Sequence, residues 1–105
     1  RGLNSLATAG SISVGRTSEE LQANFTYGDI LVCREADLSI MKQLFSASAI
    51  VTEDSTPESD HLLESIADQV EVPIIVGVKD CTRLLRTGET VELDAAKGVI
   101  TPLKV

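Results

Sequence analysis

The sequence is poor in aromatic residues and carries an excess of negative charge, and both features bear on its partners. None of the 105 residues is Trp, and aromatic residues make up only 3% of the chain, too few for a platform on which nucleic-acid bases could stack. The formal net charge is −7, so the surface repels nucleic-acid backbones and anionic lipids. We therefore expect no nucleic acid and no membrane among the partners.

Long apolar runs are also lacking. No stretch of about 18 consecutive apolar residues is present, so the sequence predicts no transmembrane helix, and residues 1–10 are too weakly apolar for a secretory signal. We therefore expect a cytoplasmic protein. The 43% of hydrophobic residues predict one domain, residues 1–105, with a core of its own. Because the chain does not begin with Met, we expect it to be a fragment of a longer protein.

Cysteine and histidine are scarce. Cys33 and Cys81 lie 48 positions apart without a paired motif, which favours two small buried residues in a reducing compartment. A disulfide or a metal pair is the alternative, but His61 is the only histidine, which argues against a Cys/His zinc site. We expect no metal and no cofactor on this domain.

Short apolar segments alternate with helical patterns, which predicts a mixed α/β domain. Three continuous apolar runs are typical of strands buried on both faces, and alternating residues predict strands near both ends of the chain. The buried strands are expected at residues 30–33, 49–52 and 74–77, and the others at 11–15, 90–94 and 99–100.

Capping residues and apolar stripes predict the helices between these strands. Thr17 begins a T-x-x-E capping box for a helix ending near Asn24, and Asp37 or Ser39 is expected to cap a second helix. From Pro57, five apolar residues form a stripe that ends before Pro73, with polar residues on the outer faces. The stripe comprises Leu62, Leu63, Ile66, Ala67 and Val70, and the outer residues are Asp60, His61, Glu64, Ser65 and Asp68. Asp80 is expected to cap a short helix over residues 81–85.

Several blocks, in this order and spacing, resemble the phosphoenolpyruvate-utilising mobile domain. The blocks are GDILV (28–32), ASAIVTE (47–53), VPIIVGV (72–78), CTRLLRTGETVELD (81–94) and AKGVI (96–100). The resemblance implies the swivelling β/β/α fold, a mixed sheet with flanking helices. This fold occurs in pyruvate phosphate dikinase, phosphoenolpyruvate synthase and enzyme I of the sugar phosphotransferase system. Residues 37–45 look most like the extra C-terminal domain of bacterial pyruvate kinases, which implies that the chain is a C-terminal fragment of a larger enzyme.

The resemblance also implies a parent enzyme with its own partners and cofactors. A pyruvate kinase-like parent would convert phosphoenolpyruvate and ADP to pyruvate and ATP, using Mg²⁺ and K⁺ in a barrel outside this chain. This domain would then contact other domains and subunits of the parent, in a structural or regulatory role. A stand-alone interaction module with the same fold is an alternative.

The loop that carries the phosphohistidine in catalytic relatives differs here. In those relatives it reads roughly T-x-x-G-G-x-T-S-H-A-A, with glycines that let the backbone approach the phosphate. The equivalent positions here are Thr52, Ser55, Thr56, Ser59 and Asp60. Ser55 and Thr56 replace the two glycines, and counting forward from Thr52 puts Asp60 at the histidine position, whereas counting back from Pro73 puts Leu62 there. We expect this phosphate loop to be degenerate.

His61 has two interpretations. As a phosphocarrier it would accept a phosphoryl group between two remote sites. However, five acidic residues lie close to it in sequence, and no Lys or Arg occurs between Lys42 and Lys79, whereas phosphoryl transfer relies on cations. The acidic residues are Glu53, Asp54, Glu58, Asp60 and Glu64. We therefore expect His61 to be a surface residue of its helix, paired with Glu58 or Glu64.

Three basic residues lie close together in the sequence around the short helix predicted at residues 81–85. Lys79, Arg83 and Arg86 could form a basic spot for a phosphate, although a solvated short helix is the favoured interpretation.

Overall fold

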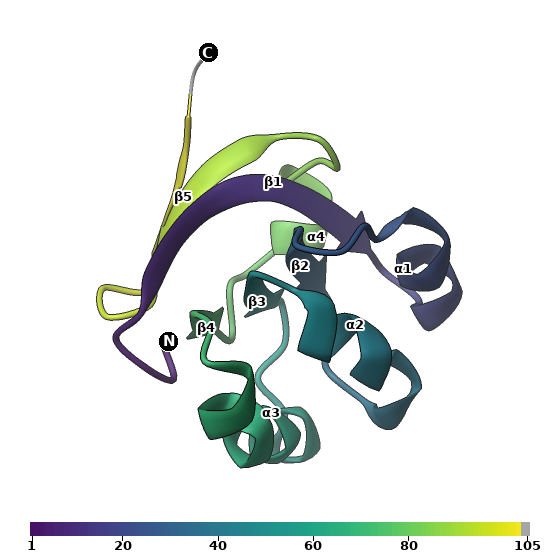
Figure 1. The fold of residues 1–105 in the computed structure, drawn as a ribbon, viewed down its shortest axis with the longest axis vertical. Coiled ribbons are helices and arrows are strands. Elements are labelled where there is room, and N and C mark those ends of the chain that lie inside the picture. The colour runs from purple at the N-terminus through teal and green to yellow at the C-terminus, as the bar shows by residue number, and fades with distance from the viewer. Residues whose placement is uncertain (104–105) are drawn as a thin grey trace.

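A computed structural model describes residues 1–103 as a curved six-stranded sheet flanked by helices (Figure 1). The strands are β1 Ala7–Gly15, β2 Ile30–Cys33, β3 Ala49–Thr52, β4 Ile74–Ile75, β5 Thr90–Asp94 and β6 Val99–Pro102. The helices are α1 Ser18–Asn24, α2 Met41–Ser46, α3 Pro57–Val70 and α4 Cys81–Leu84, and a 3₁₀ turn, η1, spans Leu38–Ile40. The predicted mixed α/β class is confirmed.

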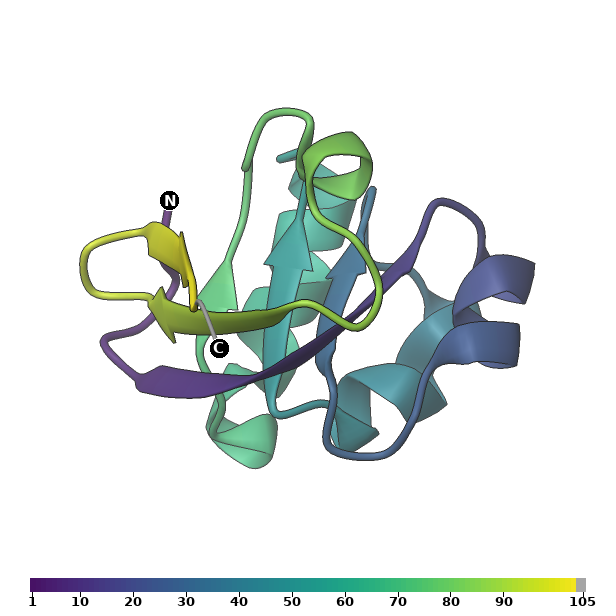
Figure 2. The ribbon, with the colours of Figure 1, turned by 90° about the horizontal axis from the view of Figure 1, so that it is seen from above.

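Strand β1 joins the two halves of the sheet. The order is β4-β3-β2-β1-β5-β6. Residues Ile12 to Gly15 of β1 pair in parallel with β2, whereas Ala7 to Ser11 pair antiparallel with β5. Figures 1 and 2 show β1 and β5 curving across the parallel strands β2, β3 and β4. Strands β1 and β5 therefore cover one face of the parallel strands of the same sheet.

Two apolar cores follow from this curvature, because successive side chains of a strand point to opposite faces. On one face, Leu31 and Ile50 pack with Leu44 of α2 and Leu63 of α3. On the other, Val32, Val51 and Ile75 pack with Cys81 of α4 and with Val91 and Leu93 of β5. Every residue of β2 and β3 is buried, as their continuous apolar runs predict.

Two predicted helix caps are confirmed. The Thr17 side chain accepts a hydrogen bond from the Glu20 backbone N–H, and the Asp37 side chain accepts one from the Ser39 N–H. Each bond satisfies a donor that has no partner within the first helical turn. The Asp37 cap begins the 3₁₀ turn rather than α2 itself.

The first strand is longer than the sequence predicts. It begins at Ala7 instead of Ser11, because its first half is formed by pairing with β5 and not by a local apolar pattern. Residues 7–10 are Ala, Thr, Ala and Gly, three of which are not strand formers.

Gly15 lets α1 approach β1 closely, which leads to a stability prediction. A Cβ at Gly15 would lie 2.4 Å from Leu21 Cγ and 2.8 Å from the Leu21 backbone N. We expect Gly15→Ala to reduce the free energy of unfolding by roughly 1–3 kcal/mol, the usual cost of overpacking, as measured by urea denaturation. Gly10→Ala is the matched control, because its Cβ would come no closer than 3.7 Å to Ile30. Equal losses in the two variants would contradict this account.

Candidate functional site

The loop after β3 and the first turn of α3 form the candidate site. β3 ends at Thr52, and the Thr56 side chain caps α3 by accepting from the Ser59 backbone N–H at 3.3 Å. Pro57 occupies the first turn of α3, where its missing N–H costs nothing. The fully buried Thr52 donates its hydroxyl to the Asp54 carbonyl at 2.9 Å. The loop is therefore held by its own polar side chains.

Asp60 faces the inside of the molecule and not solvent. Its side chain accepts hydrogen bonds from the Ser55 hydroxyl and, at 3.1 Å, from the Arg1 guanidinium. The residue is only 8% exposed, and its Oδ1 has no hydrogen-bond partner among the described residues. The prediction that Asp60 lies on the outer face of the helix is thus wrong. Asp60 stands one turn before the buried Leu63, so the two residues share a face, and a carboxylate is favourable at a helix N-terminus.

Ser59 also stabilises the fold around the start of α3 through a hydrogen bond. It is 1% exposed, and its hydroxyl accepts a hydrogen bond from the Ala36 backbone N–H at 2.8 Å. This bond ties the start of α3 to the segment that follows β2. Ser55 lies against Gly77, where an added Cβ would come within 3.4 Å of the Ser55 Cβ.

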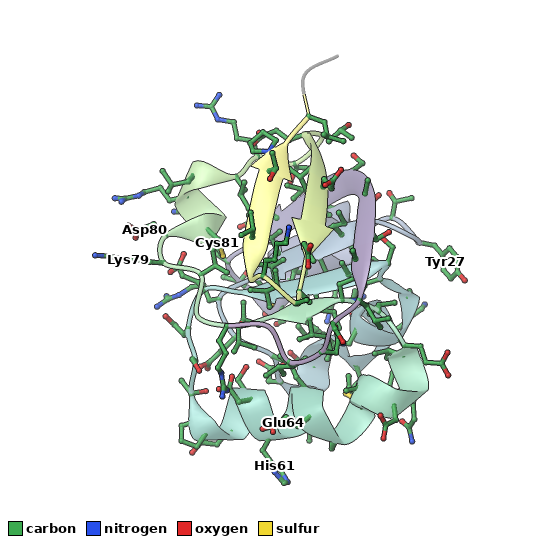
Figure 3. All side chains as sticks on the ribbon, turned by 90° about the vertical axis from the view of Figure 1, so that its left-hand side faces the viewer. Tyr27, His61, Glu64, Lys79, Asp80 and Cys81 are labelled. Carbon is green, nitrogen blue, oxygen red and sulfur yellow. The ribbon has the colours of Figure 1, made fainter. Side chains whose placement is uncertain are left out.

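His61 lies on the exposed surface of α3, next to Asp60 in sequence but on a different face. Consecutive helical residues are about 100° apart, and this step places His61 on the solvent side of α3. Figure 3 shows the His61 side chain pointing away from the sheet. With Glu58, Leu62 and Leu38, it borders a shallow groove of about 270 Å³. No ion pair between His61 and any acidic residue is present within residues 1–103.

Glu53 caps α4 from a distant part of the chain. Its Oε1 accepts from the Thr82 hydroxyl at 2.6 Å and from the Thr82 backbone N–H at 3.1 Å. These hydrogen bonds, with a smaller contribution from Arg34, lower the pKa of Glu53. Asp80, the predicted cap, adopts a left-handed conformation (φ 59°) and makes no side-chain capping bond. Its carboxylate pairs with Arg83 at 3.1 Å instead.

Both cysteines are buried free thiols, which confirms the interpretation of them as small core residues. Burial raises the pKa of Cys33 and raises that of Cys81 to about 12. Within residues 1–103, no three His, Cys, Asp or Glu side chains come together as a metal site.

The family described as PEP-utilising enzyme, mobile domain matches residues 25–98. The chain belongs to this family. It is 25% identical to pyruvate kinase from Bacillus licheniformis over 100 residues, and this alignment covers 95% of this chain and 17% of that enzyme. It is 30% identical over 92 residues to phosphoenolpyruvate synthase from Aeropyrum pernix, covering 88% of this chain and 11% of that enzyme. The chain thus spans about a sixth or less of the length of these relatives.

Solved structures share the fold. A solution structure of Enzyme I (nEIt) superposes with a TM-score of 0.62 at 17% identity, covering 83% of this chain and 38% of that one. The crystal structure of aconitase X from Thermococcus kodakaraensis superposes with a TM-score of 0.66 at 18% identity over 99% of both chains. These likenesses confirm the predicted fold, and the family match confirms the resemblance.

None of the helices formed by residues 1–103 is long and apolar enough to cross a membrane. The longest, α3, has 14 residues and an acidic outer surface.

The Glu53 cap predicts a pH-dependent stability. The pKa of Glu53 is lower in the folded chain than in the unfolded one, so its contribution is complete above the unfolded pKa of about 4.3 and is lost as the pH falls through the folded pKa. We expect Glu53→Gln to lower the free energy of unfolding at pH 7 by about 1 kcal/mol. The difference from the original chain should shrink as the pH falls below about 4.

Urea denaturation between pH 7 and pH 3 measures this difference. Glu64→Gln on the exposed surface of α3 is the matched control and should leave stability nearly unchanged. A Glu53→Gln penalty that stays constant over this pH range would contradict the capping role.

Proposed function

We propose that this chain is a non-catalytic swivelling domain of a pyruvate kinase-like enzyme. The parent would convert phosphoenolpyruvate and ADP to pyruvate and ATP in the cytoplasm, with Mg²⁺ and K⁺ bound outside this chain. The observation that carries the proposal is the identity of the buried residue at the position that counting forward from Thr52 assigns to the histidine of catalytic relatives. That residue is Asp60, which accepts a hydrogen bond from the Ser55 hydroxyl, and not a histidine.

The surroundings of the loop also oppose phosphoryl transfer there. Transfer through a histidine needs an accessible nitrogen and cations that neutralise the phosphoryl charge. Among residues 1–103, Arg1 is the one cationic partner of Asp60, and the stretch from residue 43 to residue 78 contains no Lys or Arg. A dianionic group beside Asp60 would be repelled by that carboxylate.

The proposed role is therefore structural or regulatory. A domain with two complete cores can serve as a rigid body that contacts other domains and subunits of the parent. The acidic, exposed surface of α3 offers one such contact region. Glu58, Glu64, Asp68 and Glu71 are exposed there.

Removing this domain from the full-length parent tests the proposal. We expect the truncated enzyme to keep its turnover number for phosphoenolpyruvate and ADP, because no residue of this chain takes part in the reaction. The truncation should instead change the thermal stability of the assembly or its response to effectors. Loss of phosphoryl transfer in a truncated enzyme that remains folded would overturn the proposal.

A phosphocarrier role for His61 is the second candidate. It is favoured by the exposure of His61, which makes the imidazole accessible to a partner enzyme, and by the similarity to a phosphoenolpyruvate synthase.

Labelling separates the two candidates. Full-length protein incubated with phosphoenolpyruvate carrying a labelled phosphoryl group should acquire no acid-labile label on this domain. His61→Ala and Glu64→Ala, two exposed positions on α3, form the matched pair. An acid-labile label that His61→Ala removes and Glu64→Ala retains would establish the carrier role.

A further inference from the structure

Two arginines directly follow the ends of two neighbouring strands, so they lie side by side at the carboxyl edge of the parallel sheet. Gly15 at the end of β1 pairs with Cys33 at the end of β2, so Arg16 and Arg34 follow at equivalent positions. Neighbouring strands lie about 4.8 Å apart, which brings the two side chains within reach of one small ligand. In Figure 2 the arrowheads of β1, β2 and β3 point toward the same edge, beside α4.

Two adjoining hollows share these arginines. The smaller one, of about 190 Å³, is lined by Arg16, Arg34 and Arg83, with Thr82 at its side. The larger one, of about 330 Å³, extends from Arg16 and Arg34 along α1 to Leu21 and Ile40. The carboxyl edge of parallel strands is where open α/β sheets bind their ligands.

The charges in the smaller hollow favour an anion. Three of the five arginines of a chain with a net charge of −7 converge there from three separate segments. Two carboxylates line the same hollow: Glu53, which accepts hydrogen bonds from Thr82, and Asp80, which pairs with Arg83. Three guanidinium groups therefore face two carboxylates, and the lining carries a net positive charge. Arg16 forms no ion pair with any residue the structure describes.

Arg34 is only loosely held. Its guanidinium lies 3.8 Å from the Asp54 carboxylate, and the two side chains are 57% and 41% exposed. Such an exposed pair contributes little, so a ligand can compete with Asp54 for Arg34. The basic spot of Lys79, Arg83 and Arg86, the less favoured interpretation of the sequence, does not line these hollows as a group. Lys79 points outward (Figure 3), and neither Lys79 nor Arg86 lines either hollow.

We propose that these hollows bind a phosphoryl dianion, either inorganic phosphate or the phosphate of a small phosphomonoester. One guanidinium group can donate two parallel N–H···O hydrogen bonds to a phosphate. Arg16 and Arg34 therefore bind the phosphoryl group, and Arg83 closes the smaller hollow. The organic part of a phosphomonoester occupies the larger hollow. Leu21 and Ile40 form its apolar floor.

The rim of the larger hollow restricts what that organic part can be. Glu35, Asp37 and Asp54 line this hollow and repel a second phosphate, whereas carboxylates accept hydrogen bonds from hydroxyl groups. The preferred ligand therefore carries its negative charge at one end and hydroxyl groups at the other. This binding does not depend on a pyruvate kinase parent.

An NMR titration of the ¹⁵N-labelled chain tests the site. Potassium phosphate, glycerol 3-phosphate and potassium chloride are added in parallel at matched ionic strength. We expect saturable shifts of the Arg16, Arg34 and Arg83 signals with both phosphates and none with chloride. Additional shifts at Leu21 and Ile40 with glycerol 3-phosphate would identify a phosphomonoester as the ligand, and equal affinities without them would identify free phosphate. Shifts that are linear in concentration, or reproduced by chloride, would overturn the proposal.

Charge-matched variants complete the test. Arg16→Gln and Arg34→Gln should each weaken phosphate binding about tenfold, as expected for the loss of a charge-assisted hydrogen bond. Arg86→Gln removes the same charge from an exposed position outside both hollows and should retain the original affinity. All three positions are exposed, and an unchanged pattern of core amide signals verifies folding. Equal weakening of phosphate binding in all three variants would show that only the net charge of the chain matters, and it would overturn the proposed site.

Discussion

Strand β1 forms backbone hydrogen bonds with two different partners, and the rest of the structure depends on this change of partner along one strand. Its second half adds a parallel strand to β2, and its first half pairs antiparallel with β5. Because sheets twist with a fixed hand, a strand of nine residues carries β5 and β6 across the face of the parallel strands. That crossing encloses a second core, in which Val91 and Leu93 pack against Val32 and Val51. The same register sets Arg16 beside Arg34. A change in the pairing of β1 would therefore disturb the core and the arginine-lined edge together.

The elements that could be predicted are those with a local cause. The apolar runs of β2 and β3 indicate burial on both faces, and Thr17 and Asp37 are short polar side chains that can reach the first turn of the helix that follows. The family resemblance rests on the order of such segments, and the match to residues 25–98 confirms it. The first half of β1 has no comparable signal, because Ala and Gly are poor strand formers and only the distant β5 holds them extended. Strand formation there is a tertiary effect.

The site was less predictable for the same reason. Sequence spacing offers Asp80 as the cap of α4, but Glu53, which lies 29 residues before Thr82, accepts the hydrogen bonds from Thr82. Asp60 looked like a surface residue because it is charged, although its position one turn before Leu63 was the signal that could have revealed its burial. Its partners Ser55 and Arg1 become visible only in the fold, and Arg1 is 59 residues away. Likewise, Arg83 stands close to Lys79 and Arg86 in the sequence, whereas the fold brings it to the same hollow as Arg16 and Arg34.

The distribution of charge links these observations. The segment from residue 43 to residue 78 has no Lys or Arg, and it contains β3, the loop and α3, where catalytic relatives would carry the phosphohistidine. The arginines gather instead at the ends of β1 and β2 and on α4. A phosphoryl group approaching the carboxyl edge of the sheet therefore meets repulsion at the start of α3 and attraction at the arginines. Coulomb interactions are stronger in a partly closed hollow than in bulk water. The carboxylates at the start of α3 repel a phosphoryl group, and the arginines attract it. On the two proposals made above, the arginines bind phosphate at one part of this edge, and the α3 loop, with Asp60 turned inward and His61 turned outward, takes no part in covalent transfer.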